Sequence, residues 1–211
     1  MWLWLAYLAL AIILTWPTIA NLTTHLPGNG GDDPAIAWNL WWVKYALLNQ
    51  GQNPFLTDFM FYPIGLNLAF YTLTPLNAVT ALPLLLNFGV VIASNLHLLF
   101  TFVVGAYGTF LLVRHLLAHT GGDRAIGSRL VWLSAAITGA FYAFASSKLS
   151  YVALGQFNIA SSHWLPFVIL YVSRARYKPL RLKNAVLAAL FLTMQLWSEM
   201  TYASFLLLFM Q

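Results

Sequence analysis

The sequence contains no cysteine, and few of its residues are charged. None of the 211 residues is Cys, and Asp, Glu, Lys and Arg together make up 7% of the chain. Without cysteine the chain forms no disulfide, no thiolate metal site and no cysteine nucleophile. Soluble domains carry about 25% charged residues, so this low charge content excludes an ordinary globular enzyme. The 61% hydrophobic content also excludes a disordered chain, which would be poor in apolar residues.

Several short motifs of well-known active sites are missing as well. The sequence holds no GxGxxG fingerprint, no Walker P-loop and no HExxH motif. The net charge is +5, but the Lys and Arg residues gather mainly in two short loops. That distribution is typical of membrane topology and differs from the basic face of a nucleic-acid-binding protein. We therefore expect a polytopic membrane protein that binds no nucleic acid.

Long apolar runs predict the fold class. A transmembrane helix needs about 20 mostly apolar residues. We expect spans at 1–20, 89–113, 130–146, 159–172 and from 185 onward. Pro83 and the Asn87–Gly89 break divide the apolar run that begins at Pro75. The first part, 75–87, is too short for a span and predicts a re-entrant or interfacial helix. The prediction is an all-α, polytopic transmembrane helix bundle of about five spans. It forms one domain over 1–211, and we expect it to be the N-terminal part of a longer protein.

The charged residues predict the orientation of this bundle. Short loops rich in Lys and Arg stay in the cytoplasm, which places 114–129 and 173–184 inside. The long hydrophilic stretch 21–73 holds three Asp residues and only Lys44 as a base, so it forms a large first external loop. We therefore expect a multi-pass protein of the plasma (inner) membrane with its N-terminus in the cytoplasm.

The external loop contains one strong helix signal. Asp33 followed by Pro34 reads as an N-cap and first helical residue, and the helix is expected over 34–49. This helix has an aliphatic stripe on one face and aromatic side chains on the opposite face. Because both faces are apolar, we expect the helix to lie in the membrane interface, with its aromatic face toward lipid headgroups or a ligand. The stripe is Ile36, Leu40, Val43 and Leu47, and the aromatic side is Trp38, Trp41, Trp42 and Tyr45.

Five acidic residues are the candidates for chemistry, and four of them lie outside the apolar runs. Asp32 precedes the helix, where the helix dipole favours an ionised carboxylate. It suits a general base or a metal ligand, or it is a second solvated turn residue. Asp33 has the capping role, Asp58 resembles a turn residue, and Asp123 is expected to be a surface charge beside Arg124.

Glu199 lies inside the last apolar run, where a carboxylate costs about 3 kcal/mol on insertion scales. It either faces a cavity or a partner, or it is bonded to a neighbour: Gln195, Ser198 or Tyr202. Among the histidines, His163 is expected on the external side, whereas His115 and His119 are expected to meet headgroups at a cytoplasmic helix end.

The layout and several motifs resemble the GT-C superfamily, multi-span glycosyltransferases that take sugar from a polyprenyl-phosphate donor. One span, a large external loop with an acidic motif and interfacial helices, and then further spans are the shared features. Gly31-Asp32-Asp33-Pro34 followed by Trp38-Asn39-Leu40-Trp41-Trp42 looks like the first acidic motif of the oligosaccharyltransferase catalytic subunit. Asn53-Pro54-Phe55, Tyr62-Pro63-Ile64-Gly65 and Trp164-Leu165-Pro166-Phe167 look like uncharacterised bacterial members.

The resemblance implies transfer of a sugar from a polyprenyl-phosphate donor to an acceptor on the external face, with the bilayer and the lipid-linked sugar as partners. It implies a catalytic role for Asp32 or Asp33, and a divalent cation (Mg or Mn) held by Asp32. The chain departs from the family in one respect, because no second external acidic motif is present. Residues 147–158 offer Lys148, Gln156 and Asn158 instead. The candidate substrate-binding residues are Trp38, Asn39, Trp42, Asp58, His163 and Glu199.

A second, non-enzymatic function stays open: a flippase for lipid-linked sugar, a carrier or an assembly subunit. In that case Glu199, Lys148 and Gln156 would line a polar path through the bundle.

Overall fold

The chain is mostly helical in the computed structural model, which describes residues 2–119, 121, 127–176 and 182–209. Within these ranges the strands are β1 (Leu56–Thr57) and β2 (Leu66–Asn67), an antiparallel pair with Leu56 opposite Asn67. The all-α prediction is confirmed. The helices are α1 (Trp2–Leu14), α2 (Asp33–Lys44), α3 (Pro75–His119), α5 (Ser128–Ala143), α6 (Ser146–Ala153), α7 (Phe157–Ala160), α8 (Leu165–Arg176), α9 (Leu182–Ser198) and α10 (Met200–Phe209), with a π-helical turn at Tyr45–Gln50 and a 3-10 turn at Leu68–Phe70.

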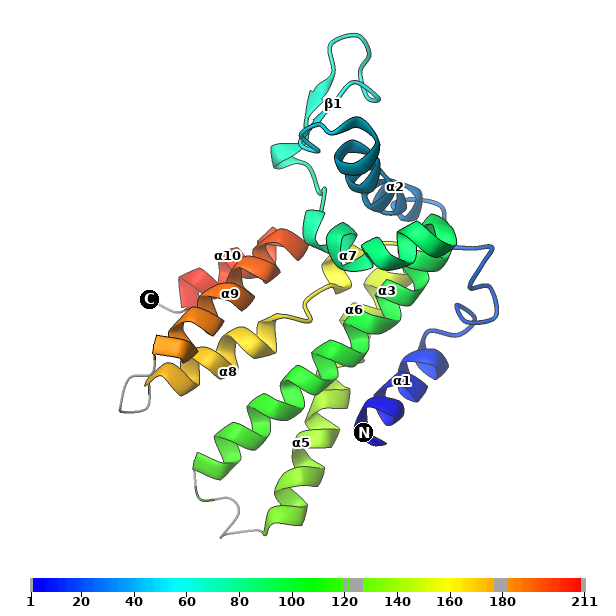
Figure 1. The fold of residues 1–211 in the computed structure, drawn as a ribbon. Helices are drawn as coiled ribbons and strands as arrows, with labels where there is room; N and C mark the ends of the chain where they lie inside the picture. Colours follow the sequence, from blue (N-terminus) through cyan, green and yellow to red (C-terminus); the bar gives the residue numbers. More distant parts are fainter. Residues whose placement is uncertain (1, 120, 122–126, 177–181, 210–211) are drawn as a thin grey trace.

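Two stretches of helix are long and apolar enough to cross a membrane: α3, and Ser128–Ala153, which combines α5 with α6. The other expected spans correspond to shorter helices. α1 ends at Leu14 because Pro17 disfavours helix at the residue before it. The segment between α7 and α8 is not helical, so α8 begins at Leu165 rather than at 159. The final apolar run is divided at Glu199, and α10 lies beside α9 in Figure 1 instead of extending it.

The expected break near Asn87–Gly89 is confirmed inside α3. Gly89 has φ 79° and ψ 176°, a backbone conformation that is essentially restricted to glycine. The helix therefore changes direction there, and Figure 1 shows the part before Gly89 lying across the upper end of the long part. Residues 75–88 thus form a separate short helix, as the sequence predicts.

The long part of α3 is the centre around which the other helices pack. α3 as a whole contacts α1, α2, α5, α8 and α9, and the buried side chains of its long part include Leu98, Phe102 and Phe110. Tyr7 on α1 donates a hydrogen bond of 2.9 Å to the carbonyl of Ala136 on α5. The bundle therefore has a continuous core, although large apolar side chains also remain exposed on its outer faces.

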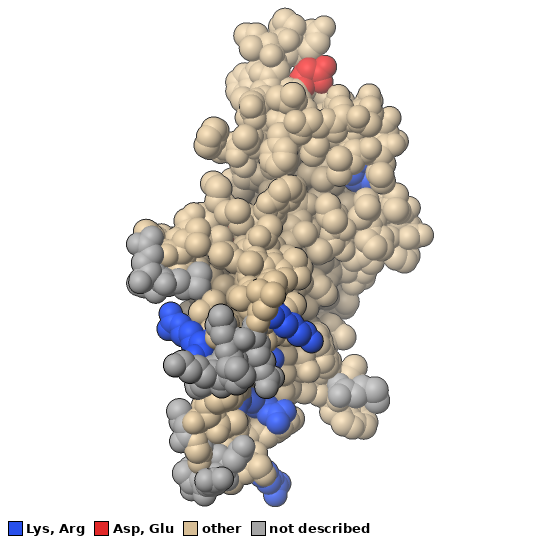
Figure 2. Space-filling model, turned by 60° about the vertical axis from the view of Figure 1, so that its left-hand side comes forward, with Lys and Arg blue, Asp and Glu red and all other residues tan. Residues whose placement is uncertain are grey.

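The segment 21–73 forms a cap over one end of this bundle (Figure 1). Asn95 of α3 holds the beginning of the segment, because its amide donates to the carbonyls of Leu22 and His25, both at 2.9 Å. The β1–β2 hairpin projects farthest from the bundle. Most of the Lys and Arg side chains visible in Figure 2 gather toward the opposite end of the molecule.

The helix expected at 34–49 is present, with two corrections. It begins at Asp33, so the N-cap position belongs to Asp32 and not to Asp33, and the Asp32 side chain makes no capping hydrogen bond. Ile36, Leu40 and Val43 are buried as expected, but Leu47 is exposed. The π-helical turn from Tyr45 to Gln50 is wider than an α-helical turn, which changes the direction of the side chains that follow.

Candidate functional site

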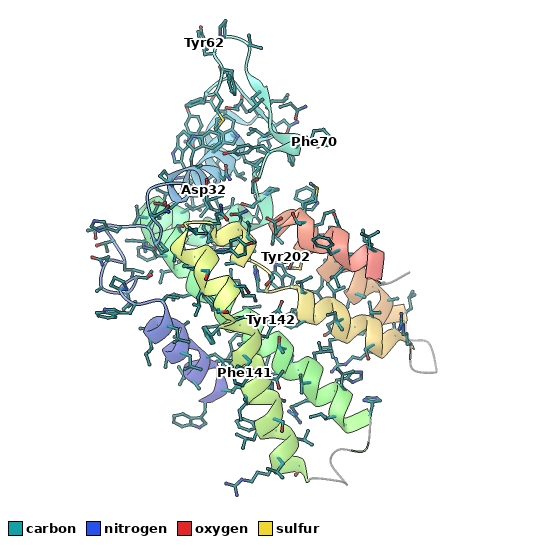
Figure 3. The ribbon with its side chains drawn as sticks, turned by 180° about the vertical axis from the view of Figure 1, so that it is seen from behind. Asp32, Tyr62, Phe70, Phe141, Tyr142 and Tyr202 are labelled. Carbon is teal, nitrogen blue, oxygen red and sulfur yellow. The ribbon has the colours of Figure 1, made fainter. Side chains whose placement is uncertain are left out.

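The Asp32 side chain is hydrogen-bonded to a residue 124 positions later in the sequence. The Gln156 side-chain amide donates a hydrogen bond to Asp32 Oδ2. Asp32 itself is exposed, and Figure 3 shows it where the cap meets the helices. A hydrogen bond to an ionised group is stronger than one between neutral groups, so Gln156 orients the carboxylate.

Two contacts hold Asp33 in place, one with Gly30 and one with Gly155. Its Oδ1 accepts a hydrogen bond from the Gly30 amide at 2.9 Å. Gly155, with φ +79°, lies so close that a Cβ there would come within 2.7 Å of the Asp33 backbone nitrogen. Only glycine allows this approach. The turn 28–31, the start of α2 and the segment before α7 are therefore held together at Asp33.

Glu199 belongs to a buried polar cluster. Its Oε2 accepts from the Asn158 amide at 3.3 Å, and its Oε1 accepts from the Thr201 backbone N–H at 3.1 Å. Gln195 donates to the Ser161 carbonyl at 3.1 Å. The Glu199 side chain is thus bound by Thr201 and by Asn158, 41 positions earlier. Of the three expected neighbours, Gln195 bonds the Glu199 backbone, since its amide donates to the Glu199 carbonyl at 3.5 Å. The buried polar cluster consists of Asn77, Asn158, Ser161, Gln195, Ser198 and Glu199, all of them buried.

One short segment connects the two acidic sites. Gln156 contacts Asp32, and Asn158, two residues later, contacts Glu199. Two residues of extended chain span at most about 7 Å. The amides that replace a second acidic motif in the sequence therefore connect Asp32 and Glu199 through one short segment. Sequence reasoning found the two amides but not their partners, since nothing local to them indicates Asp32 or Glu199.

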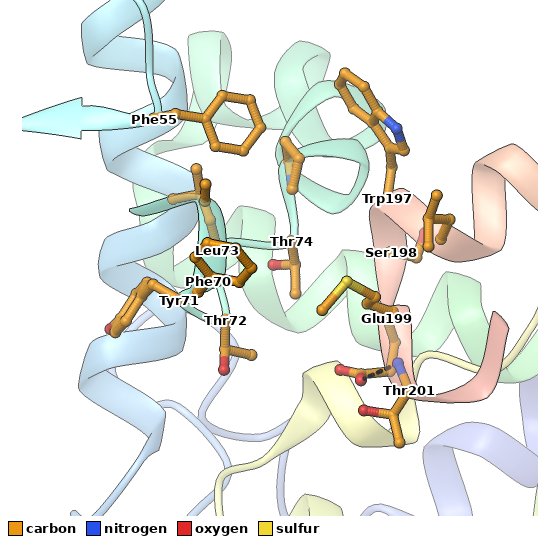
Figure 4. A pocket seen from close by; sticks show the side chains of 14 residues that line it. Phe55, Phe70, Tyr71, Thr72, Leu73, Thr74, Trp197, Ser198, Glu199 and Thr201 are labelled. Atoms are coloured by element: carbon orange, nitrogen blue, oxygen red, sulfur yellow. Dashed lines mark hydrogen bonds between the residues drawn. The ribbon is translucent and has the colours of Figure 1, made fainter. Parts of the chain in front are cut away.

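A pocket of about 330 Å³ opens beside Glu199, between the 69–75 segment and the α9–α10 break. We call it the Glu199 pocket. In Figure 4, Phe55 and Trp197 stand at one end of it, and Glu199, Thr201 and Thr72 stand at the other. The rings of Phe55 and Trp197 are 6.4 Å apart and nearly perpendicular. The pocket therefore has an aromatic end and a polar end.

Tyr71 links this pocket to Asp32 electrostatically. Tyr71 is half-buried and lines the Glu199 pocket. Burial raises the pKa of its phenol, and the negative charge of Asp32 raises that pKa further. The phenol therefore stays protonated near neutral pH and can donate a hydrogen bond.

The predicted substrate-binding residues of α2 lie in the packing of the cap. Asn39 is completely buried, and its amide donates to the Thr72 carbonyl. Trp42 is also buried and donates from Nε1 to the Pro54 carbonyl at 2.8 Å. Trp38 stacks on Trp42 with ring centres 5.5 Å apart, and Phe59 covers Trp42 from the hairpin. The aromatic side of α2 thus packs largely against its own loop, and its contact with a substrate stays a prediction.

The remaining candidates have other surroundings. Asp58 is exposed on the hairpin. His163 is buried, and neither of its ring nitrogens has a hydrogen-bond partner. The Lys148 ammonium lies 3.8 Å above the Tyr142 ring. Asp123 falls outside the described residues. Asp32, Asp33, Gln156, Asn158 and Glu199 are therefore the polar groups that the fold brings together.

The acidic residues supply few ligands for a cation. Within the described ranges, no group of three or more His, Cys, Asp or Glu side chains could hold a metal ion. Asp32 and its neighbour Asp33 supply at most two carboxylates. Mg²⁺ is commonly bound by one or two carboxylates together with substrate phosphate and water, so this donor set fits a cation that arrives with a phosphate.

Comparison of the chain with models of protein families, with curated proteins and with solved structures finds no match.

Proposed function

We propose that the protein is an integral membrane glycosyltransferase of the GT-C type that transfers a sugar from a polyprenyl-phosphate donor to an acceptor on the external face. The observation that carries this proposal is the Asp32 carboxylate, exposed at the start of α2 and bonded to Gln156. A base for an incoming acceptor must be ionised, oriented and accessible. Asp32 meets these requirements, while Asp33 is engaged with Gly30 and Gly155.

In the proposed reaction, Asp32 takes the proton of the acceptor hydroxyl as its oxygen attacks the anomeric carbon of the donor. The bond from that carbon to the phosphate oxygen breaks, and the lipid phosphate leaves. Gln156 holds the carboxylate in place, and the dipole of α2 favours its charged form. A divalent cation bound by Asp32 together with the donor phosphate would neutralise charge on the leaving group.

The membrane arrangement belongs to the same proposal. Large apolar side chains project outward from several helices, among them Trp2, Phe141 and Leu182 at 80%, 75% and 77% exposure; Figure 3 labels Phe141 on α5. Exposed apolar surface of this extent suits lipid contact. We infer a multi-pass bundle of about five crossings in the plasma (inner) membrane, with the 21–73 cap outside and the N-terminus in the cytoplasm. The gathering of basic side chains at the end away from the cap (Figure 2) supports that orientation.

The decisive experiment measures transfer from a polyprenyl-phosphate sugar by the full-length protein in membranes, with and without a chelator. We expect Asp32→Asn to abolish transfer without changing expression or thermal stability, because both proposed roles need a charged carboxylate. Asp123→Asn, which removes a carboxylate expected on the cytoplasmic side, is the matched control and should retain full activity. Normal transfer by Asp32→Asn would overturn the assignment.

A carrier or flippase is the second candidate, and the broken helix at Glu199 favours it. A buried carboxylate at a helix break is a common element of transporter binding sites. In that case Asp32→Asn would be tolerated, whereas Glu199→Gln would abolish movement of the lipid-linked sugar across the bilayer. Measuring both variants for transfer and for movement separates the two functions.

A further inference from the structure

The Glu199 pocket combines features that select for a particular kind of ligand. Its volume of about 330 Å³ lies at the lower end of the range for small-molecule sites, about 300–1,000 Å³. Trp197 and Phe70 are 48% and 98% exposed, so their ring faces are accessible. The opposite end presents a carboxylate and several hydroxyl groups (Figure 4). A ligand that fills the pocket must therefore have both an apolar face and hydrogen-bonding edges.

The polar end is rigid and is not saturated with hydrogen bonds. Asn158 and the Thr201 N–H hold one oxygen each of the Glu199 carboxylate, and a carboxylate can accept about four hydrogen bonds. Thr74 and Ser198 also line the pocket, but their hydroxyl oxygens are buried beneath its wall and have no hydrogen-bond partner. Buried polar groups without a partner are rare and require an explanation. A ligand with several hydroxyl groups would supply the hydrogen bonds that the Glu199 carboxylate can still accept.

The backbone at Thr74 is strained at the same place. Thr74 has φ +49°, which is a genuine outlier for a β-branched residue. Residues held in such conformations cluster at functional sites, where the surrounding structure maintains them. Thr74 lines the pocket in this conformation, and its carbonyl accepts the N–H of Asn77 at 3.1 Å.

We propose that the Glu199 pocket binds one pyranose ring, with Glu199 accepting hydrogen bonds from sugar hydroxyls and Trp197 covering a face of the ring. This inference rests on the proposed function and assigns the sugar of that reaction to a defined subsite. A pyranose has a face of C–H groups, which suits the negative face of an aromatic ring, and a rim of hydroxyls, which suits the carboxylate.

Other ligand classes fit the pocket less well. None of the residues that line it is Lys or Arg, so a phosphate would face Glu199 without a compensating cation. A purely apolar chain would leave the buried carboxylate and hydroxyls without partners, which carries a desolvation cost. A neutral polyol has neither problem.

The cysteine-free chain allows a direct test of binding. Thr201→Cys places a thiol at the pocket wall, and Tyr62→Cys, at 81% exposure on the hairpin, places one far outside it. The labelling rate of each variant by a maleimide is measured with the full-length protein in lipid nanodiscs. One arm adds free methyl hexopyranosides, and the other adds a polyprenyl-phosphate hexose, with polyprenyl phosphate alone as its control.

We expect sugar to slow labelling of Thr201→Cys about tenfold at a concentration about ten times its Kd, and to leave Tyr62→Cys unchanged. Protection by the free glycosides alone would identify the acceptor as the source of the ring, and protection by the lipid-linked hexose alone would identify the donor. Absence of protection in both arms, or equal protection by polyprenyl phosphate alone, would overturn the proposal. Thr72→Cys repeats the test if Thr201→Cys does not fold.

Variants of the pocket separate binding from folding. Glu199→Gln and Trp197→Leu should each weaken protection, the first by about tenfold in Kd because a charged hydrogen bond is lost. Phe141→Leu removes an exposed ring far along α5 and should have no effect. Protection without any sugar transfer would support the pocket and contradict the transferase. Transfer that depends on Asp32, without protection of the pocket, would support the transferase and contradict the pocket.

Discussion

Asp32 and Asp33 are neighbours in the chain, yet the fold gives them different surroundings. Asp33 is half-buried, accepts the Gly30 amide and lies against Gly155. Asp32 is exposed and accepts a hydrogen bond from Gln156. One carboxylate is therefore committed to holding three segments together, and the other is available to a ligand.

A pair of substitutions at Asp33 tests this division. Asp33→Asn keeps an oxygen that can accept from Gly30 and should have little effect on stability, whereas Asp33→Ala should lose about 1 kcal/mol. Thermal unfolding of the two variants in detergent gives the comparison. If both retain the fold but lose sugar transfer equally, Asp33 takes part in catalysis and the division is wrong.

Gln156 is a positioning residue, because it acts through Asp32. Gln156→Met removes the donor at similar volume and should lower transfer about tenfold, as expected for one hydrogen bond to a charged group. Stability should change little since the contact is exposed. Gln52→Met, a matched change at an exposed glutamine of the cap, should transfer sugar at the original rate. A Gln156→Met protein with unchanged activity would show that Asp32 needs no support from this amide.

At the scale of helices, breaks rather than continuous segments create the site. The break at Gly89 turns the 75–88 helix across the end of the bundle (Figure 1). It thereby brings Asn77 within 3.4 Å of Ser161. The break at Glu199 leaves that carboxylate between α9 and α10, where Thr201 and Asn158 can bind it.

Gly89→Ala tests the first of these breaks. A Cβ meets no neighbouring atom there, so the cost comes from the backbone conformation alone and should be about 2 kcal/mol. Gly51→Ala is the matched control, because Gly51 is an ordinary left-handed C-cap with φ 62° and ψ 28° and should cost about 1 kcal/mol. Unfolding in mixtures of SDS and detergent provides the values. If both substitutions lowered the free energy of unfolding equally, the unusual backbone conformation at Gly89 would not be required by the fold.

For the whole molecule, the distribution of charge and of exposed apolar side chains predicts one orientation in the bilayer. Tyr62→Cys on the hairpin should react with an impermeant thiol reagent on intact cells. Ser128→Cys, exposed at the start of α5, should react only after the cells are permeabilised. The absence of native cysteine gives both variants a clean background. Labelling of Ser128→Cys in intact cells with protection of Tyr62→Cys would reverse the proposed topology.

Much of the secondary structure follows from local signals in the sequence. The helix near 34–49 was predicted from Asp33-Pro34 and an aliphatic stripe, and the division of 75–113 from Asn87–Gly89. These predictions succeed because proline, glycine and helical periodicity act over a few residues. They fail where a second local effect intervenes, as at Leu47, which follows a π-helical turn, and at α1, which Pro17 shortens.

The candidate site depends on contacts that no local pattern contains. Gln156 and Asp32 are 124 positions apart, and Asn158 and Glu199 are 41 positions apart. The sequence by itself determined which polar residues are candidates for a function. Carboxylates and amides are few in this apolar chain, and placing one inside an apolar helix bundle costs free energy. Only the tertiary structure decided which of them meet, since pairing between distant segments depends on how α3 and its neighbours pack. It also turned Trp42 and Asn39 inward, because the loop that follows α2 folds back and covers them.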